Sequence, residues 1–285
     1  MLGSEVLKVF SDCKKFLITA TYKDYRSLRQ LKKNTIFAHN IKFVKFNLEE
    51  NYETLLKKLM NKNEYIINCI GIIKPFIDEK NKRIENPILI NSLFPNQLNK
   101  FKNKKNKIYQ IATDCVFSGL NGNYLESSQH DAIDIYGKTK SLGEIKSKNF
   151  FNIRCSIIGK EIKNYVSLFE WFKLQKKNIN GFTNHLWNGL TTNVFAELLK
   201  AIIIYKIDLP NVIHIIPKDK ISKFTLLNYF KLITNNTKIK IKKKIAKTEI
   251  DRTLNTSYLS KNLEIWEKSI FHQQLKLKDI VETII

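Results

Sequence analysis

Short apolar runs alternate with longer amphipathic stretches through the first half of the chain, and this alternation constrains the fold more than any other feature. Runs rich in Ile, Val and Phe are typical of strands, and the stretches between them have the spacing of helices. Strands and helices in this order predict an α/β fold, a parallel sheet covered by helices. The expected strands are 16–19, 42–46, 65–70, 108–112 and 151–157, and the clearest helices are 52–60, 88–101 and 136–146.

The pattern changes near residue 158. Aromatic-rich helices, a polar loop over 178–192 and two further strand candidates, 212–216 and 238–242, follow it. A chain of 285 residues is long enough for a sheet domain and a smaller appended one. The expected division is 1–158 for a nucleotide-binding domain and 159–285 for a mainly substrate-binding domain, with 190–216 returning to the first.

The formal net charge is +23, from 49 Lys and Arg against 26 Asp and Glu. Such a charge suggests an anionic partner, for which nucleic acid, a membrane surface and phosphorylated small molecules are the candidates. The lysines are spread along the whole chain, however, and the densest runs, 102–107 and 238–244, lack the interleaved aromatic residues of a single-strand binding surface. We therefore expect neither nucleic acid nor a membrane as partner.

Four cysteines lie far apart without a C-x-x-C pair, which predicts neither a zinc site nor a disulfide framework. No signal peptide opens the chain, and the most apolar helical stretch, 196–204, is too short to span a bilayer. We therefore expect a cytoplasmic protein without a bound metal.

The first seven residues have the pattern of a glycine-rich turn that ends and runs into an amphipathic helix. A dinucleotide site needs a strand before that turn, and glycines that let the backbone approach the pyrophosphate. We expect the first strand and part of the glycine-rich loop to be missing from the printed chain. The alternative is a chain that begins with a helix and binds no dinucleotide.

Tyr136 and Lys140 open a predicted helix, and their spacing of four places both side chains on one face. A neighbouring ammonium favours the phenolate, so we expect Lys140 to lower the pKa of Tyr136 and make it a useful general acid. This spacing alone is common in Lys-rich chains. Upstream, Thr113 and Asp114 end an apolar strand, where open α/β sheets bind ligands. Strand-end capping is the alternative role for these two residues.

Taken in order, these segments resemble the dTDP-4-dehydrorhamnose reductase family of sugar-nucleotide reductases, within the extended short-chain dehydrogenase/reductase superfamily. The resemblance rests on A-T-D-C-V-F-S-G at 112–119, G-N-Y-L-E at 122–126 and Y-G-K-T-K-S-L-G-E at 136–144. Residues 184–192 and 252–256 are similar to two further family elements that bear on substrate. Covering nearly the whole chain, the resemblance implies a Rossmann-type doubly wound parallel sheet with a smaller C-terminal substrate domain.

The resemblance implies that Thr113, Tyr136 and Lys140 are catalytic. A reduced nicotinamide would give a hydride to the 4-keto carbon of a nucleotide-linked 6-deoxysugar, while Tyr136 gives a proton to the oxygen. Thr113 would hydrogen-bond that oxygen, and Lys140 would hold the nicotinamide ribose. Such a reaction belongs to nucleotide-sugar and surface polysaccharide biosynthesis. The substrate is expected to contact Thr113, Asp114, Val116, Arg154, Asn184, His185, Trp187 and Arg252.

The expected cofactor is NADPH, with NADH as the alternative. Lys23 and Arg26 follow the predicted strand at a position where an NAD-selective site often has an acidic residue. A homodimer is compatible with the family. The cofactor is expected to contact Leu2, Gly3, Lys23, Arg26, Asn47, Leu48, Asn68, Cys69, Ile70, Gly71, Tyr136 and Lys140.

The chain departs from the family pattern at several positions. Cys115 replaces a Tyr, Ser118 an Asp, and Ala132 a Pro, while Asn184 and His185 stand for Asp-Gln. The catalytic residues are kept, so these changes leave the exact sugar open more than the reaction type. Two rivals are an epimerase or dehydratase that recycles bound NAD, and a non-catalytic binding or regulatory subunit, which the missing first strand favours. A nucleic-acid binder is a third, which a steep loss of DNA affinity with salt would support.

Overall fold

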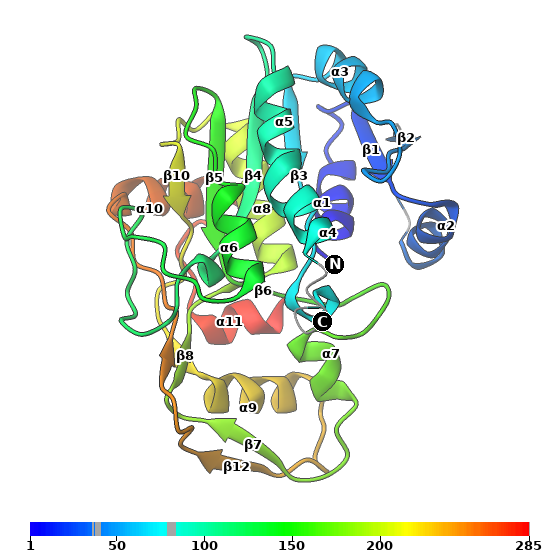
Figure 1. Ribbon diagram of the computed structural model, residues 1–285. Helices are drawn as coiled ribbons and strands as arrows, with labels where there is room; N and C mark the ends of the chain where they lie inside the picture. Colours follow the sequence, from blue (N-terminus) through cyan, green and yellow to red (C-terminus); the bar gives the residue numbers. More distant parts are fainter. Residues whose placement is uncertain (36, 38–40, 79–83, 285) are drawn as a thin grey trace.

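The computed structural model describes residues 1–35, 37, 41–78 and 84–284 (Figure 1). The helices are α1 (Leu2–Ser11), α2 (Tyr25–Asn34), α3 (Glu53–Lys62), η1 (Lys74–Phe76), α4 (Glu85–Pro87), η2 (Ile88–Leu93), α5 (Phe94–Phe101), η3 (Asp114–Val116), α6 (Ile135–Leu142), α7 (Leu168–Lys173), α8 (Thr192–Ile204), α9 (Lys223–Ile233), α10 (Leu259–Lys268) and α11 (Leu277–Glu282). The strands are β1 (Ile18–Tyr22), β2 (Ile41–Lys45), β3 (Tyr65–Asn68), β4 (Lys107–Thr113), β5 (Phe150–Cys155), β6 (Ile157–Ile158), β7 (Ile179–Phe182), β8 (His185–Trp187), β9 (Leu190–Thr191), β10 (Val212–His214), β11 (Ile221–Ser222), β12 (Ile241–Lys244) and β13 (Ile250–Asp251).

A parallel sheet in the order β10-β5-β4-β3 forms the centre of the upper part of the molecule (Figure 1). β1 and β2 form a separate parallel pair beside β3. Helices α5 and α6 cover the near face of the sheet, and α1 and α8 lie behind it. This layering confirms the predicted α/β fold class with a parallel sheet.

Strand β4 is buried along almost its whole length, as a central parallel strand with helices on both faces should be. Behind it, α8 is apolar nearly all round, and Phe195, Leu198 and Leu199 are completely buried in the main core. α8 therefore acts as an internal support for the sheet.

The lower part of the molecule contains small sheets that join distant segments (Figure 1). β8 pairs with β11 and β13, and β7 pairs with β12. The predicted polar loop 178–192 is therefore wrong, because it contains β7, β8 and β9. The strand predicted at 238–242 is displaced to Ile241–Lys244.

Several strand boundaries in the first half also differ from the prediction. β3 ends at Asn68 and not at residue 70, and β5 ends at Cys155 and not at residue 157. The strand expected at 16–19 begins at Ile18, because the Phe16 ring packs against Phe10 at 5.6 Å between centroids instead of joining the sheet.

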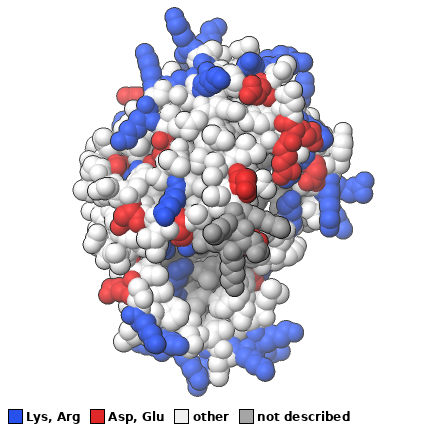
Figure 2. All heavy atoms as spheres, viewed as in Figure 1, with Lys and Arg blue, Asp and Glu red and all other residues white. Residues whose placement is uncertain are grey.

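Charged side chains are distributed over the visible face rather than gathered in one basic patch. Figure 2 shows Lys and Arg along the top, the right side and the bottom of this face, with Asp and Glu between them. None of the helices among the described residues is long and apolar enough to cross a membrane.

Truncation of a buried side chain of α8 should destabilise the fold. Leu199→Ala removes a completely buried side chain, and we expect it to lower the free energy of unfolding by about 2–5 kcal/mol. Leu232→Ala, at a position 65% exposed on α9, is the matched control and should change it by less than about 1 kcal/mol. Urea denaturation followed by circular dichroism measures both, and equal losses would contradict the assignment of α8 to the core.

Candidate active site

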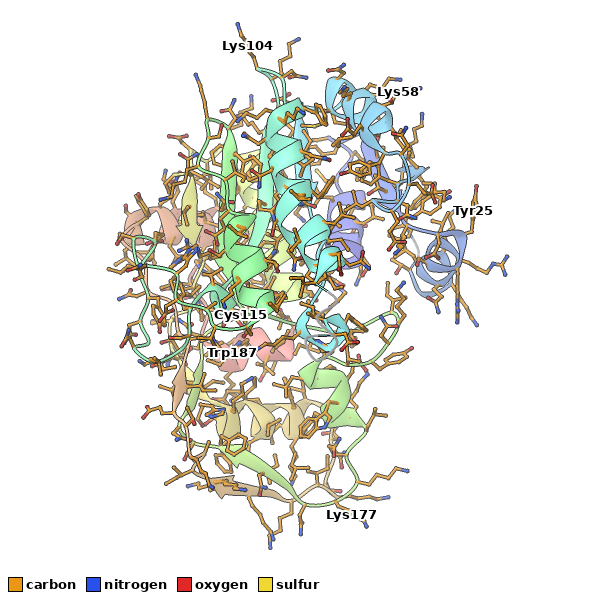
Figure 3. The ribbon with its side chains drawn as sticks, viewed as in Figure 1. Tyr25, Lys58, Lys104, Cys115, Lys177 and Trp187 are labelled. Carbon is orange, nitrogen blue, oxygen red and sulfur yellow. The ribbon has the colours of Figure 1, made fainter. Side chains whose placement is uncertain are left out.

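The carboxyl end of β4 carries two buried polar residues, Thr113 and Asp114. The Thr113 hydroxyl donates to Asp114 Oδ1 at 3.1 Å and accepts the backbone N–H of Cys115 at 3.2 Å. Thr113 thereby caps the short helix η3, as the alternative role predicted. Figure 3 labels Cys115 at the lower end of the sheet.

Helix α6 lies directly against η3, and a glycine makes this possible. A Cβ on Gly137 would lie 2.2 Å from the carbonyl oxygen of Cys115, so only glycine permits this approach. Asp134 caps the helix by accepting the N–H of Gly137 at 2.8 Å, and it forms an ion pair with Lys74 at 2.7 Å. The sequence therefore fixes where the first turn of α6 lies.

The first turns of α6 bring Tyr136 and Lys140 to the end of β4. Burial raises the pKa of Tyr136, although a hydrogen bond with Thr113 opposes this change. Burial lowers the pKa of Lys140 to about 8, and its ammonium donates to the carbonyl of Ile111 at 2.6 Å. The predicted lowering of the Tyr136 pKa by Lys140 is therefore wrong for this structure, because loss of solvation is the larger effect on the phenol.

Sequence reasoning missed Asn91, which lies in the π-helical turn η2 and is 2% exposed. Its amide accepts the N–H of Ile72 and donates to the carbonyl of Ile72, both at 3.0 Å, and it also donates to the Thr139 hydroxyl at 3.2 Å. Asn91 thus ties the loop after β3 to α6. An Asn inside an otherwise apolar helical run was the available signal, and π-helical turns are frequent at functional sites.

The N-terminus of α1 lies beside the loop that follows β3. A Cβ on Gly3 would lie 3.3 Å from the Cβ of Cys69, so the two segments are in close contact. Asn68 is buried, donates to the Gln110 side chain at 2.7 Å and accepts the N–H of Ile70 at 3.1 Å. The structure brings these predicted cofactor residues together. Gly71 lies on the same loop, while Leu2 packs against the main core.

The predicted cations of the cofactor site lie where β1 ends. Lys23 forms an ion pair with Glu49 at 2.8 Å, and both side chains are about half exposed. Asn47 follows β2 and accepts the N–H of Glu49 at 3.2 Å, and Leu48 beside it is buried. Arg26 is exposed on α2. Lys23, Asn47 and Arg26 therefore surround one end of the β1–β2 pair.

Two cations from the C-terminal half of the chain lie near the carboxyl end of β4. Arg252 donates through Nε to the carbonyl of Phe117 at 2.9 Å, directly after buried Val116. Burial lowers the pKa of Lys223, and the Asp114 carboxylate opposes that change. Lys223 was missed because nothing distinguishes it from the many other lysines of the sequence.

Arg154 is not available to a substrate, contrary to the prediction. It is 2% exposed, and its guanidinium donates to Glu144 at 2.7 and 2.8 Å, to His130 at 2.6 Å and to His214 at 3.1 Å. A further bond reaches the carbonyl of Glu126 at 3.3 Å. A buried charge needs such compensation, and this set of bonds leaves Arg154 a structural role.

The residues predicted from 184–192 also make internal contacts. The Asn184 amide bonds the backbone of Ala246 at 2.9 and 3.0 Å, and half-buried His185 bonds the carbonyl of Thr248 at 3.1 Å. Trp187, labelled in Figure 3, is 5% exposed and donates to Ser156 at 2.9 Å. These contacts hold the lower sheets together, so direct substrate binding by these three residues stays a prediction.

Comparison with known proteins identifies the family. A family model described as "RmlD substrate binding domain" matches residues 20–277, and the chain therefore belongs to this family. No curated protein sequence matches the chain.

Solved structures share the fold. A dTDP-4-dehydrorhamnose reductase from Bacillus anthracis in complex with NADP is similar with a TM-score of 0.69 at 17% identity, over 94% of this chain and 97% of that chain. A dTDP-4-dehydrorhamnose reductase from Clostridium acetobutylicum has a TM-score of 0.66 and 17% sequence identity, over 94% of this chain and 97% of that chain. A UDP-glucuronic acid 4-epimerase from Bacillus cereus in complex with NAD has a TM-score of 0.71 and 13% sequence identity, over 99% of this chain and 91% of that chain. The Rossmann-type fold of extended short-chain dehydrogenases is thereby confirmed.

The Arg154 network should make stability depend on pH through His214. Its ring donates to the carbonyl of Asn255 at 2.6 Å and accepts from Arg154, and burial lowers its pKa to about 4. The unfolded chain therefore binds more protons between pH 6.5 and about 4, and stability falls as the pH falls through this window. The expected slope is about 1 kcal/mol per pH unit.

The variant His214→Gln should remove that part of the slope, and urea unfolding at several pH values measures it. His272→Gln is the control on a second histidine. If both variants keep the slope of the parent protein, His214 is not its source.

Proposed function

We propose that the chain is an NADPH-dependent reductase of the 4-keto group of a nucleotide-linked 6-deoxysugar such as dTDP-4-dehydrorhamnose. The single observation that carries this proposal is the meeting of Thr113, Tyr136 and Lys140 where β4 ends and α6 begins. Family membership and the NADP complex of the Bacillus anthracis relative support it.

The described residues fit a nicotinamide dinucleotide. The first turn of α1 presents backbone N–H groups, which suit a pyrophosphate, beside the Cys69 loop. Lys23 and Arg26 suit a 2′-phosphate, and this favours NADPH over NADH. Lys140 would hold the nicotinamide ribose with its ammonium. When bound, the cofactor supplies the hydride.

The side chains of the site would handle the proton. The raised pKa of Tyr136 keeps its phenol protonated at neutral pH, so it has a proton to give to the oxygen that becomes an alkoxide. Thr113 would hydrogen-bond the same oxygen and orient it. The carbonyl becomes an alcohol, with its new hydrogen from the hydride and its hydroxyl proton from Tyr136.

The substrate class follows from the cations near Asp114. Arg252 and Lys223 provide charge for a diphosphate, and the guanidinium suits phosphate oxygens in particular. A sugar linked to a nucleoside diphosphate would therefore be held at its phosphates, with the keto group toward Tyr136. A recycling epimerase or dehydratase would show no net consumption of NADPH.

Loss of the phenol should remove the activity. Tyr136→Phe should reduce NADPH oxidation with dTDP-4-dehydrorhamnose by about 10²- to 10⁴-fold, because it removes the acid that the proposal places at the substrate oxygen. NADPH absorbance follows the reaction, and exposed Tyr205→Phe is the matched control. A protein that binds NADPH but oxidises it equally with and without the Tyr136 hydroxyl would disprove the proposal.

The reaction should also weaken at alkaline pH. Lys140 has a pKa of about 8, so its ammonium is present below that pH and is lost above it. We expect the rate to fall as the pH rises through about 8. Lys140→Arg stays protonated and should lose this alkaline limb even if its maximal rate is lower. Lys138→Arg, exposed on the same helix, is the control and should keep the fall in rate above pH 8. If this variant also loses the fall, a group other than Lys140 causes it.

A further inference from the structure

Residues 252–257 follow β13 and run beside residues 117–126, and we call them the Arg252 segment. The carbonyl of Tyr124 accepts the N–H of Asn255 at 2.8 Å. Because residues 117–126 follow the end of β4, this contact brings the Arg252 segment from the C-terminal half of the chain to the candidate active site.

The guanidinium of Arg252 is fixed by only one of its nitrogens. Nε donates to the carbonyl of Phe117 at 2.9 Å. The side chain passes directly over Gly119, where a Cβ would lie 2.9 Å from Arg252 Cγ. Within the described part of the chain, no hydrogen bond or ion pair engages the two terminal nitrogens. Arg252 therefore presents two oriented donors, and such a fork suits the oxygens of a phosphate group.

Glu126 holds the far end of the Arg252 segment from a buried position, with its side chain 6% exposed. One carboxylate oxygen accepts the Thr256 hydroxyl at 2.6 Å, and the other accepts the N–H of Ser257 at 2.9 Å. The first oxygen also accepts the N–H of His214, in β10, at 3.0 Å. Three donors from two distant parts of the chain thus converge on one carboxylate, which compensates its burial.

The Arg252 segment is therefore held from two sides. The Asn188 amide bonds the backbone of Leu254 at 2.7 and 2.9 Å and ties the segment to the lower sheets. Glu126 ties it to β10, which belongs to the same sheet as β4. The backbone pairing at Tyr124 is an isolated bridge, and pairing this short is marginal without side-chain support. The placement of Arg252 relative to the end of β4 therefore depends on Glu126.

We propose that Glu126 is a positioning residue, which orients Arg252 in advance for the diphosphate of the substrate. The inference rests on the proposed function, because it concerns the phosphate contact given there to Arg252. Glu126 fixes the segment before the ligand arrives, so binding does not have to bear the entropy cost of ordering a long side chain. Its contribution should therefore be seen in affinity for the nucleotide and not in the chemical step at Tyr136.

The test measures binding of dTDP to the 285-residue protein by calorimetry, without cofactor. Glu126→Gln replaces one acceptor oxygen by an amide group, and it should raise the Kd for dTDP by about 5- to 10-fold. In an Arg252→Ala background the same change should alter the Kd by less than about 2-fold, because the residue that Glu126 positions is gone.

Glu267→Gln, at an exposed position on α10, is the matched control and should leave the Kd unchanged. If Glu126→Gln does not fold, Thr256→Val removes one hydroxyl donor to the carboxylate and keeps the shape of the side chain. It should give a smaller rise in Kd, again only while Arg252 is present.

Three outcomes would overturn the proposal. An equal rise with and without Arg252 would show that Glu126 has only a structural role. An unchanged Kd in folded Glu126→Gln would show that Arg252 needs no such support. An unchanged Kd in Arg252→Ala alone would show that Arg252 does not contact the phosphates.

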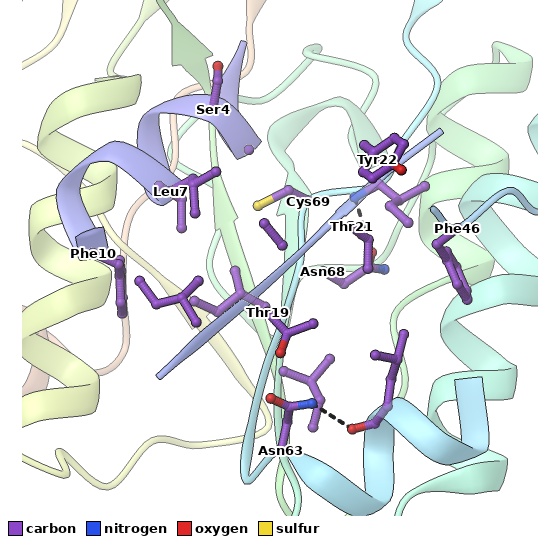
Figure 4. A pocket seen from close by; sticks show the side chains of 18 of the residues that line it. Ser4, Leu7, Phe10, Thr19, Thr21, Tyr22, Phe46, Asn63, Asn68 and Cys69 are labelled. Carbon is purple, nitrogen blue, oxygen red and sulfur yellow. Dashed lines mark hydrogen bonds between the residues drawn. The ribbon is translucent and has the colours of Figure 1, made fainter. Parts of the chain in front are cut away.

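This binding test is separate from the cofactor side of the molecule. A cavity of about 860 Å³ lies there, and the predicted cofactor residues Gly3, Asn68 and Cys69 are among those that line it (Figure 4). Neither Glu126 nor Arg252 lines that cavity. A protein that binds dTDP through Arg252 but oxidises no NADPH would disprove the reductase proposal and leave the role of Glu126 standing.

Discussion

The candidate site depends on the contact between α6 and the end of β4, and the buried ammonium of Lys140 is its centre. That ammonium donates to the carbonyl of Ile111 at 2.6 Å, so the strand and the helix are joined at the depth where Thr113 ends the sheet. Burial lowers the pKa of Lys140 to about 8, so charged Lys140 costs stability at neutral pH, and this cost falls as the pH rises above 8. A residue that served only stability would be better replaced by an apolar one. The buried ammonium is therefore best explained by a role in binding a ligand.

The buried charge of Arg154 is compensated by neighbouring groups, although the whole chain has a net charge of +23. Arg154 illustrates the difference, since Glu144 and two histidines surround it and it can reach no ligand. Near the carboxyl end of β4, Arg252 and Lys223 lie among three carboxylates, those of Asp114, Asp131 and Asp134. Cations at the carboxyl end of β4 suit a phosphorylated ligand, whereas most of the other lysines lie on the surface, where salt screens them.

The sequence was sufficient to predict the elements that carry a strong period. β4 lies within one residue of the expected bounds, because nearly all of its residues are buried. α6 begins within one residue of the expected start, after an Asp cap, but ends at Leu142, four residues before the expected end. β7, β8 and β9 were missed, because strands of two to four residues are formed by pairing with distant segments. The role of Arg154 was misjudged for a related reason, since His130 and Glu144 approach it only in the folded chain. Spacing likewise placed Tyr136 correctly, but it could not show that burial outweighs a nearby charge.

The combination of a raised pKa at Tyr136 and a lowered pKa at Lys140 suits the proposed proton transfer from the phenol to an alkoxide. A phenol that keeps its proton at neutral pH can give it to an alkoxide, which is far more basic. Removing the Lys140 charge would take away the group that can stabilise the phenolate left behind. In the proposed reaction Lys140 would thus have two uses, as a hydrogen-bond donor before the proton moves and as a counter-charge afterwards. Both need the ammonium, so the alkaline limit of the reaction should be set by Lys140 and not by the loss of the Tyr136 proton.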